Sequence, residues 1–273
     1  MTKSELETLC RQSCEIVRNV GQFLKQELGK VSAEAIETKS LNSLVSYVDK
    51  TAEEQLVSGL GALLPNSTFL TEEETVEQKD GEFQWIIDPL DGTTNFLHQL
   101  PFFSISVALR HRDETVLGIV LEVNREECFY AWKGGGAFLN DKKIKVSDSK
   151  TLGDSLIATG FPYYDYERVE PFVETLKYFM KNTRGIRRFG SAALDLVYVA
   201  CGRFDAFYEY SLNAWDVAGG ACIVKEAGGI VLDFQGGENY LFGKEIIAVN
   251  PNIQQTFLAP IKAAFYPKQH KSV

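Results

Sequence analysis

The chain has 273 residues, of which 45% are hydrophobic and 24% are charged, so it can bury a sizeable core and is neither disordered nor of low complexity. Its 28 basic and 37 acidic residues give a net charge of -9, and this excess of negative charge disfavours nucleic acid as a partner. At this length we expect one large domain or two closely packed subdomains.

The first half of the chain is predicted to begin with helices, and strands follow them. Apolar residues recur at helical spacing over residues 4–29, and Ser46 with Asp49 predicts a capping box that begins a second helix, which ends near Leu64. Residues 30–45 between these helices are predicted to form a polar connection. Alternating or β-branched runs then predict strands over residues 83–87, 104–109, 115–123, 128–132, 137–139 and 143–146.

Helices and strands are predicted to alternate in the second half. Helical patterns cover residues 166–181, 191–201 and 215–227. Strand patterns cover residues 155–159, 204–209, 230–233 and 245–249. Pro251 suits the first turn of a last helix. This order predicts layered α and β structure in one compact unit, with an N-terminal α+β subdomain over residues 1–150 and a C-terminal α/β subdomain over residues 151–273.

Nothing in the sequence predicts export or insertion into a membrane. The N-terminal residues are charged where a signal peptide would be apolar, and no apolar run approaches the length of a membrane-spanning helix. The five cysteines are scattered and form no CxxC pair, which is typical of small buried thiols in a reducing compartment. We therefore predict a cytoplasmic protein with no membrane partner.

The segment from Trp85 to Phe96 combines a predicted strand with two closely spaced carboxylates. Apolar residues lead to Asp88, Pro89 removes a backbone donor, and Asp91 follows before Gly92 allows a sharp turn. Two carboxylates on one turn repel each other unless a proton or a cation lies between them, and hard oxygen ligands favour Mg²⁺ or Mn²⁺. Backbone N–H groups after Gly92, at an expected helix start, suit a phosphate group.

Two other acidic positions could join the same site. Glu72-Glu73-Glu74 follows a short apolar run shortly before this segment, although a solvated face is the usual explanation of such an acidic run. Asp216 begins an expected helix, where a carboxylate also serves as an N-terminal cap. The small residues from Ala218 to Gly220 would let this helix approach another backbone closely and bring Asp216 beside the first two carboxylates.

Taken together, these segments resemble the inositol monophosphatase family. The stretch from Trp85 to His98 is similar to the first signature of that family, and the stretch from Trp215 to Gly229 is similar to the second, with Glu72-Glu73 in the expected place before them. The likeness extends from the first helix to about Val249. It implies an α+β fold, the layered α/β/α/β/α sandwich of the inositol monophosphatase and fructose bisphosphatase type, and a homodimer.

The resemblance also implies a set of metal ligands. Glu72, Asp88 and the backbone carbonyl of Leu90 would hold one Mg²⁺, and Asp88, Asp91 and Asp216 would hold a second. A third, weaker ion would lie near Glu72 through water molecules. Two or three Mg²⁺ are therefore expected per site, with Mn²⁺ as an alternative, and most of their ligands belong to the N-terminal subdomain.

Catalytic and substrate-binding roles follow from the same resemblance. The implied catalytic residues are Asp49, Glu72 and Thr93, of which Thr93, paired with Asp49, would orient and deprotonate the attacking water. Lys39 lies where the family has a mobile loop near the third metal. The residues implied to bind substrate are Asp91, Gly92, Thr93, Gly190, Ser191, Ala192, Glu209 and Asp216.

The implied activity is Mg²⁺-dependent, lithium-sensitive hydrolysis of myo-inositol monophosphates to inositol and phosphate by a metal-activated water. Departures from the animal members of the family, between Glu72 and Asp88 and around residues 160–185, keep three other phosphate esters open as substrates: 3′-phosphoadenosine 5′-phosphate, fructose 1,6-bisphosphate and histidinol phosphate. A regulatory binding protein without enzymatic activity is a further alternative. The roles of Arg187-Arg188 and of the segment Tyr163–Tyr166, in binding an anion, lining a pocket or forming a subunit interface, also stay open.

Overall fold

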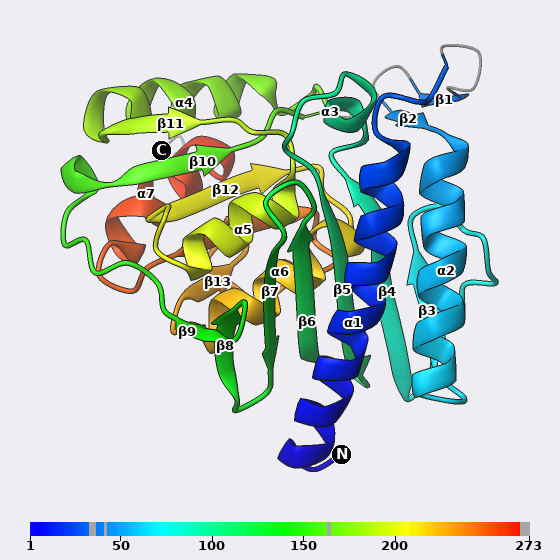
Figure 1. The fold of residues 1–273 in the computed structure, drawn as a ribbon. Helices are drawn as coiled ribbons and strands as arrows, with labels where there is room; N and C mark the ends of the chain where they lie inside the picture. Colours follow the sequence, from blue (N-terminus) through cyan, green and yellow to red (C-terminus); the bar gives the residue numbers. More distant parts are fainter. Residues whose placement is uncertain (33–36, 41–42, 163–164, 268–273) are drawn as a thin grey trace.

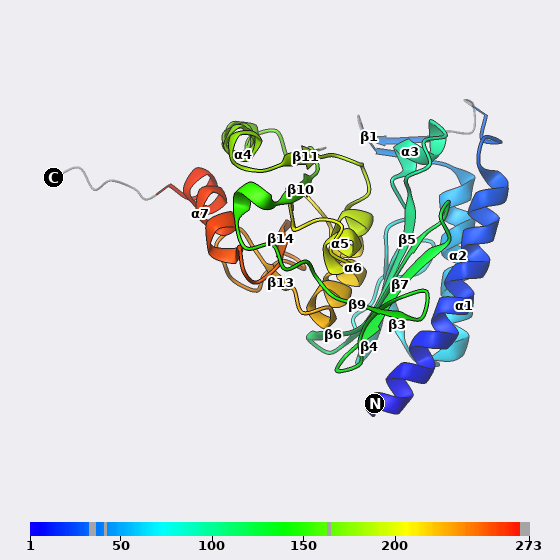
Figure 2. The same ribbon diagram turned by 60° about the vertical axis from the view of Figure 1, so that its left-hand side comes forward.

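The computed structural model describes residues 1–32, 37–40, 43–162 and 165–267, and these residues form five stacked layers (Figures 1 and 2). Two helices, α1 (Lys3–Glu27) and α2 (Tyr47–Leu63), cover the outer face of a first sheet. Two more helices lie between this sheet and a second one, and a last pair covers the far face of the second sheet. The predicted α+β class and the α/β/α/β/α order of layers are confirmed.

The first sheet contains the strand of the acidic segment. Its strands, in spatial and sequence order, are β3 (Thr68–Thr71), β4 (Phe83–Asp91), β5 (Ser104–His111), β6 (Glu114–Glu122), β7 (Glu127–Trp132), β8 (Gly136–Leu139) and β9 (Lys142–Ile144). β3 and β4 pair in parallel, whereas the other neighbours are antiparallel. β4 and β6 are buried along most of their length because helices cover both faces of this sheet.

The helices α1 and α2 lie side by side on the outer face of this sheet. The apolar stripe of α1, which includes Leu9 and Val17, packs on β6 and β7, and α2 packs against β4. α2 begins at the predicted capping box, in which the Ser46 backbone N–H donates to Asp49 Oδ2 at 2.8 Å. The cap therefore fixes the start of α2 beside the acidic strand.

The second sheet is mixed and packs against the central helices. Its strands, in spatial order, are β11 (Gly185–Arg187), β10 (Leu156–Thr159), β12 (Ala206–Tyr210), β14 (Glu245–Val249) and β13 (Ile230–Leu232). The three strands β11, β10 and β12 are parallel to one another, and β14 runs antiparallel to both of its neighbours. The helices of the two adjoining layers are α5 (Ala192–Ala200) and α6 (Ala214–Glu226) in the centre, and α4 (Val169–Asn182) and α7 (Gln254–Phe265) outside.

Three short strand regions differ from the prediction. The expected connection over residues 30–45 contains a two-stranded antiparallel ribbon, β1 (Glu37–Ser40) with β2 (Ser43–Val45), so Lys39 belongs to a strand. β3 and β11 have no counterpart among the predicted strands. Strands of three or four residues carry too little periodicity to be recognised locally, because their pairing partners define them.

The outer helices begin later than predicted. α4 starts at Val169 instead of residue 166, after a 3-10 turn at Leu152–Asp154 and β10. α7 starts at Gln254 instead of Pro251 and carries Pro260 inside it. Tyr163 and Tyr164, whose role was left open, lie outside the described residues.

The cysteines, which all lie in the described ranges, form no disulfide. All five cysteines are free, and each of them except Cys201 is buried, as predicted for small apolar side chains. None of the described helices has both the length and the apolar character that crossing a membrane requires.

Gly118 of β6 lies where α6 approaches the first sheet. A Cβ atom at this position would collide with the Gly219 carbonyl oxygen and would lie 2.9 Å from Cys222 Cβ. We expect Gly118→Ala to lower the free energy of unfolding by about 1–3 kcal/mol, because overpacking forces the helix and the strand apart. Urea unfolding followed by circular dichroism measures this change.

The matched control is Gly153→Ala, because Gly153 is exposed and its nearest neighbour, Thr151 Oγ1, is 3.9 Å from the added Cβ. This variant should stay within about 0.5 kcal/mol of the wild type. Equal stability of the two variants would contradict the close packing of α6 on β6.

Candidate active site

A bulge in β4 turns the two aspartates of the acidic segment to the same face of the first sheet. Asp88 pairs with Ser106 and Asp91 pairs with Ser104, so three residue steps on β4 oppose two steps on β5. In a regular strand, residues three apart point to opposite faces, and the extra residue at Pro89-Leu90 removes this offset. The prediction that the strand ends at residue 87 and that both carboxylates lie on one turn is therefore wrong, because the strand continues through Asp91 in bulged form.

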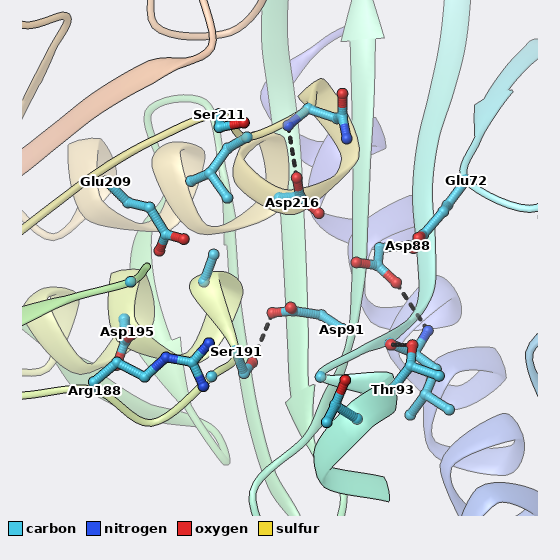
Figure 3. A pocket seen from close by; sticks show the side chains of 18 residues that line it. Glu72, Asp88, Asp91, Thr93, Arg188, Ser191, Asp195, Glu209, Ser211 and Asp216 are labelled. Carbon is cyan, nitrogen blue, oxygen red and sulfur yellow. Dashed lines mark hydrogen bonds between the residues drawn. The ribbon is translucent and has the colours of Figure 1, made fainter. Parts of the chain in front are cut away.

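Asp91 connects β4 to the start of α5. Its Oδ2 accepts hydrogen bonds from Ser191 Oγ at 2.6 Å, from the Ala193 backbone N–H at 2.8 Å and from Ser104 Oγ at 3.5 Å. Figure 3 shows the bond between Ser191 and Asp91 across the cavity floor. The position of Asp91 is therefore set by residues from both halves of the chain.

Asp216 lies in the first turn of α6, where the sequence predicts it. Its Oδ2 accepts a hydrogen bond from the Asn213 backbone N–H at 2.6 Å and completes a capping box. The helix is held to the first sheet by Ser106 Oγ, which donates to the Trp215 carbonyl at 3.2 Å. Figure 3 shows the Asp216 carboxylate on the same side of the cavity as Asp88 and Asp91.

Thr93 begins the short helix α3 (Thr93–Leu97), directly after Gly92, whose φ of 97° favours glycine. Thr93 Oγ1 lies 3.2 Å from Asp49 Oδ1 and 3.0 Å from the Leu90 carbonyl, and it can donate its hydrogen to either oxygen. Asp49 is 1% exposed, and burial raises its pKa, although hydrogen bonds from the start of α2 and from Thr93 oppose the rise. The predicted pair of Thr93 and Asp49 is therefore in contact.

Glu72 directly follows β3 and comes close to Asp88 through the backbone. Its N–H donates to the Ile87 carbonyl of β4 at 3.2 Å. Of the acidic run that follows β3, Glu72 lines the cavity and Glu74 is exposed. The parallel pairing of β3 with β4 thus brings one of these three acids to the site.

The predicted site residues lie at one cavity of about 120 Å³ (Figure 3). Asp49 does not line the cavity itself but contacts Thr93, which does. The other predicted residues all line it: Glu72, Asp88, Leu90, Asp91, Gly92, Thr93, Gly190, Ser191, Ala192, Glu209 and Asp216.

Burial and mutual repulsion raise the pKa values of the clustered aspartates. Burial, together with the charges of Glu72, Asp91 and Asp216, raises the pKa of Asp88 well above its ordinary value. Burial raises the pKa of Asp91 to about 6, although hydrogen bonds from the start of α5 oppose the rise. Burial and the charge of Asp91 raise the pKa of Asp216 to about 8. Such a cluster strongly favours a bound proton or a bound cation.

The donor atoms of this cluster fit a hard divalent cation. The four carboxylates and the Leu90 carbonyl supply oxygen ligands alone, which Mg²⁺ and Mn²⁺ prefer over softer metals. In the described ranges, no three His, Cys, Asp or Glu side chains already enclose a metal position, so ligation requires these side chains to turn toward the ion. A cation there would replace the protons that the raised pKa values favour.

The opposite side of the cavity carries a second charged group, formed by Glu209, Asp195 and Arg188 (Figure 3). Glu209 is 5% exposed, and burial raises its pKa to about 8. Gly160 leaves room for it, since a Cβ at that glycine would collide with the Glu209 carboxylate. Burial also raises the pKa of Asp195 well above its ordinary value, and the positive charge of Arg188 opposes the rise at both acids.

Asp195 is a cavity residue that the sequence analysis missed. It is 1% exposed, and its Oδ1 has no hydrogen-bond partner among the described groups. It lies within the helix predicted over residues 191–201, and that prediction gave it no role in the site. The available signal was its place as the one charged residue in the apolar run of α5.

The structure separates the two neighbouring arginines of the sequence. Arg188 lines the cavity, with its Cζ 5.3 Å from the centre of the Phe161 ring. Arg187 does not line this cavity, and its guanidinium donates to the Ile186 carbonyl. Tyr166, at the end of the undecided tyrosine segment, is 54% exposed. Of these residues, Arg188 is therefore the one placed to contact a ligand.

Comparison with known proteins agrees with this fold. Residues 5–264 match the sequence model of the inositol monophosphatase family, and the chain belongs to this family of phosphatases. It is 42% identical over 247 residues to a putative Nus factor SuhB of Neisseria meningitidis serogroup B, covering 90% of this chain and 95% of that protein. It is 39% identical over 243 residues to an inositol-1-monophosphatase of Mesorhizobium japonicum, covering 89% and 91% respectively.

A solved structure supports the same assignment. The extragenic suppressor protein suhB from Bartonella henselae superimposes with a TM-score of 0.86 at 39% identity, covering 91% of this chain and 96% of that one. The sandwich of the inositol monophosphatase type that the resemblance implied is thereby confirmed. The family assigns phosphatase chemistry, whereas its members carry names that point to different biological roles.

Glu209 should make the metal-free protein less stable as the pH rises. Its folded-state pKa of about 8 exceeds the ordinary value of 4.5, so between these values the folded chain holds a proton that the unfolded chain releases. This contribution to stability is present at low pH and is lost as the pH rises through the folded-state pKa. In EDTA, the unfolding free energy of the wild type should fall between about pH 5 and about pH 8. That of Glu209→Gln should fall by at least about 1 kcal/mol less over the same range.

Urea unfolding at the two pH values measures this difference. Glu174→Gln, at an exposed position of α4, is the control and should follow the wild type. If Glu209→Gln also follows the wild type, Glu209 does not hold a proton in the folded protein.

Proposed function

We propose that this protein is a Mg²⁺-dependent phosphatase that hydrolyses myo-inositol monophosphates to inositol and phosphate. The observation that carries the proposal is the cluster of Glu72, Asp88, Asp91 and Asp216 around one small cavity. Among the described residues that line this cavity, Arg188 is the one basic residue, and it lies on the opposite side. A phosphate dianion would therefore be repelled from this cavity unless cations occupied the acidic side.

The proposed ligand sets follow the placement of the acids. Glu72, Asp88 and the Leu90 carbonyl would hold one Mg²⁺, Asp88, Asp91 and Asp216 would hold a second, and a third would lie near Glu72. Mn²⁺ fits the same oxygen donors. Bound cations supply positive charge that neutralises the phosphate oxygens and lowers the pKa of a water molecule in the site.

Thr93 and Asp49 would position this water and accept its proton. Thr93 Oγ1 can accept a hydrogen bond from the water while its own hydrogen points to Asp49 Oδ1. Proton transfer from the water to Thr93, and from Thr93 to Asp49, leaves the threonine unchanged and the aspartate protonated. The raised pKa of Asp49 favours this role, because it makes the carboxylate a stronger base. The Gly92 and Thr93 N–H groups would hold the phosphate.

The side of the cavity away from the cation cluster would bind the inositol ring. Glu209, Asp195 and the backbone at Gly190, Ser191 and Ala192 offer hydrogen-bonding groups there. The raised pKa values of Glu209 and Asp195 keep both acids protonated at neutral pH, so they present neutral hydrogen-bonding groups beside Arg188. Such groups suit the hydroxyls of a polyol better than the second phosphate of a bisphosphate, whose charge only one arginine would offset.

A substrate panel tests the proposal. Purified protein with millimolar Mg²⁺ is assayed for phosphate release from inositol 1-phosphate, fructose 1,6-bisphosphate, 3′-phosphoadenosine 5′-phosphate and histidinol phosphate. We expect kcat/KM to be at least about tenfold higher for inositol 1-phosphate, because each alternative brings a charge that this cavity does not match. Inhibition by Li⁺ is expected. A higher kcat/KM for any other ester would overturn the substrate assignment.

Asp88→Asn should abolish turnover without harming the fold. Asp88 Oδ1 accepts a hydrogen bond from the Leu90 N–H at 2.9 Å, and an asparagine carbonyl can accept it equally well. The loss of a negative ligand should lower kcat by at least about 100-fold. The loss of repulsion should leave thermal stability in EDTA equal to the wild type or higher.

The same two measurements on Glu174→Gln provide the control, which should match the wild type in both. An active Asp88→Asn enzyme would argue against Asp88 as a ligand. A variant that is inactive but also unfolded would contradict the repulsion described for this cluster.

A second candidate role is that of a regulatory binding protein, because the Neisseria meningitidis relative is named a putative Nus factor. The two roles are compatible and can be separated with Asp88→Asn. Cells that lack the protein are complemented with the wild type or with this variant. Rescue by the inactive variant would assign the phenotype to binding, whereas failure to rescue would assign it to phosphate hydrolysis.

A further inference from the structure

A buried carboxylate outside the cavity holds the segment that carries Glu72. Glu53 of α2 is 0% exposed and accepts hydrogen bonds from four neutral donors. Its Oε1 accepts from Thr71 Oγ1 at 2.8 Å, from the Thr75 N–H at 2.8 Å and from Thr75 Oγ1 at 2.7 Å, and its Oε2 accepts from the Glu73 N–H at 2.8 Å. Both oxygens of this side chain are therefore engaged by one short segment.

These donors lie on both sides of Glu72 in the chain. Thr71 precedes it and Glu73 follows it, while the Glu72 N–H itself donates to the Ile87 carbonyl at 3.2 Å. Gln78 closes the same segment, since its Oε1 accepts from the Thr71 N–H at 2.8 Å. The backbone of Glu72 is thus held at three consecutive residues, between α2 and β4.

The helix that supplies Glu53 also supplies Asp49. The two residues are four apart, so they lie on the same face of α2, one turn from each other. Asp49 contacts Thr93 Oγ1, whereas Glu53 contacts the segment of Glu72. One helix therefore holds two separate parts of the site at a set distance.

We propose that Glu53 is a positioning residue, which fixes Glu72 relative to Asp88 and Thr93 so that Glu72 can take part in cation binding. The role rests on the proposed function, since it concerns an acid assigned there to a Mg²⁺. A buried carboxylate is costly to desolvate, and four neutral donors offset that cost only while the segment keeps this geometry. The same interactions that stabilise the charge thus define the path of residues 71–75.

Glu53→Gln tests this role, because glutamine keeps the volume of the side chain but replaces one acceptor oxygen with an amino group. The amide nitrogen of glutamine cannot accept a hydrogen bond, so the donors of the segment that face it lose their acceptor. We expect Mg²⁺ binding, measured by calorimetry without substrate, to weaken by about 10- to 100-fold. Amide hydrogen exchange at Glu73 and Thr75 should become faster. At saturating Mg²⁺, the KM for inositol 1-phosphate should stay within about twofold of the wild type.

The control is Glu54→Gln, which makes the same chemical change at the next, exposed position of α2. It should leave Mg²⁺ binding and amide exchange unchanged. If Glu53→Gln fails to fold, Thr75→Val removes one of the four hydrogen bonds and should give a smaller change in the same direction. Unchanged Mg²⁺ affinity in whichever of these two variants folds would overturn the proposal.

A double variant separates positioning from general stability. In a Glu72→Gln background, Glu53→Gln should weaken Mg²⁺ binding by less than about twofold, because its effect passes through Glu72. Additive losses in the two backgrounds would show that Glu53 acts on the whole fold and would overturn the positioning role. A wild-type protein that binds Mg²⁺ but prefers another ester would overturn the substrate assignment and leave the role of Glu53 standing.

Discussion

The structure of the site depends on the repulsion among buried carboxylates that share one small cavity. Asp88, Asp91 and Asp216 have raised pKa values because they lie close together away from bulk water. Each is nevertheless held in place by a donor that carries no positive charge: the Leu90 N–H, Ser191 Oγ and the Asn213 N–H. Neutral donors orient the carboxylates but leave their charge uncompensated, which is the condition that favours a cation.

Several layers of the fold meet at this cavity, and each contributes a different kind of group. The first sheet supplies Asp88 and Asp91, the outer helix α2 holds Thr93 through Asp49, and the central helices supply Ser191 and Asp216. The second sheet contributes Glu209 on the opposite side. In the proposed function, phosphate and polyol would be bound on opposite sides of the cavity, so the polyol side can vary while the cation side is preserved.

Some features of the site can be predicted from residues that are close together in the sequence, and others cannot. The capping box of α2 and the place of Asp216 at a helix start were predictable, since each depends on residues a few positions apart. Glu53 and Asp195 were not, because a carboxylate within a helical run resembles a solvated helix residue until the neighbouring segments are known. The ribbon of β1 and β2 was missed for a similar reason, since short strands are defined by pairing.

The sequence by itself determined the family resemblance, the α+β class and most of the acids that line the cavity. Two long signatures and helical periodicity can be recognised from the order of the residues alone. Only the tertiary structure decided how those acids meet. Asp88 and Asp91 share a face because β5 pairs across a bulge, and Glu72 stands beside them because Glu53 and β4 hold its segment. Register and distant hydrogen bonds depend on partners that residue order does not specify, so the geometry of the charge cluster appears only in the folded chain.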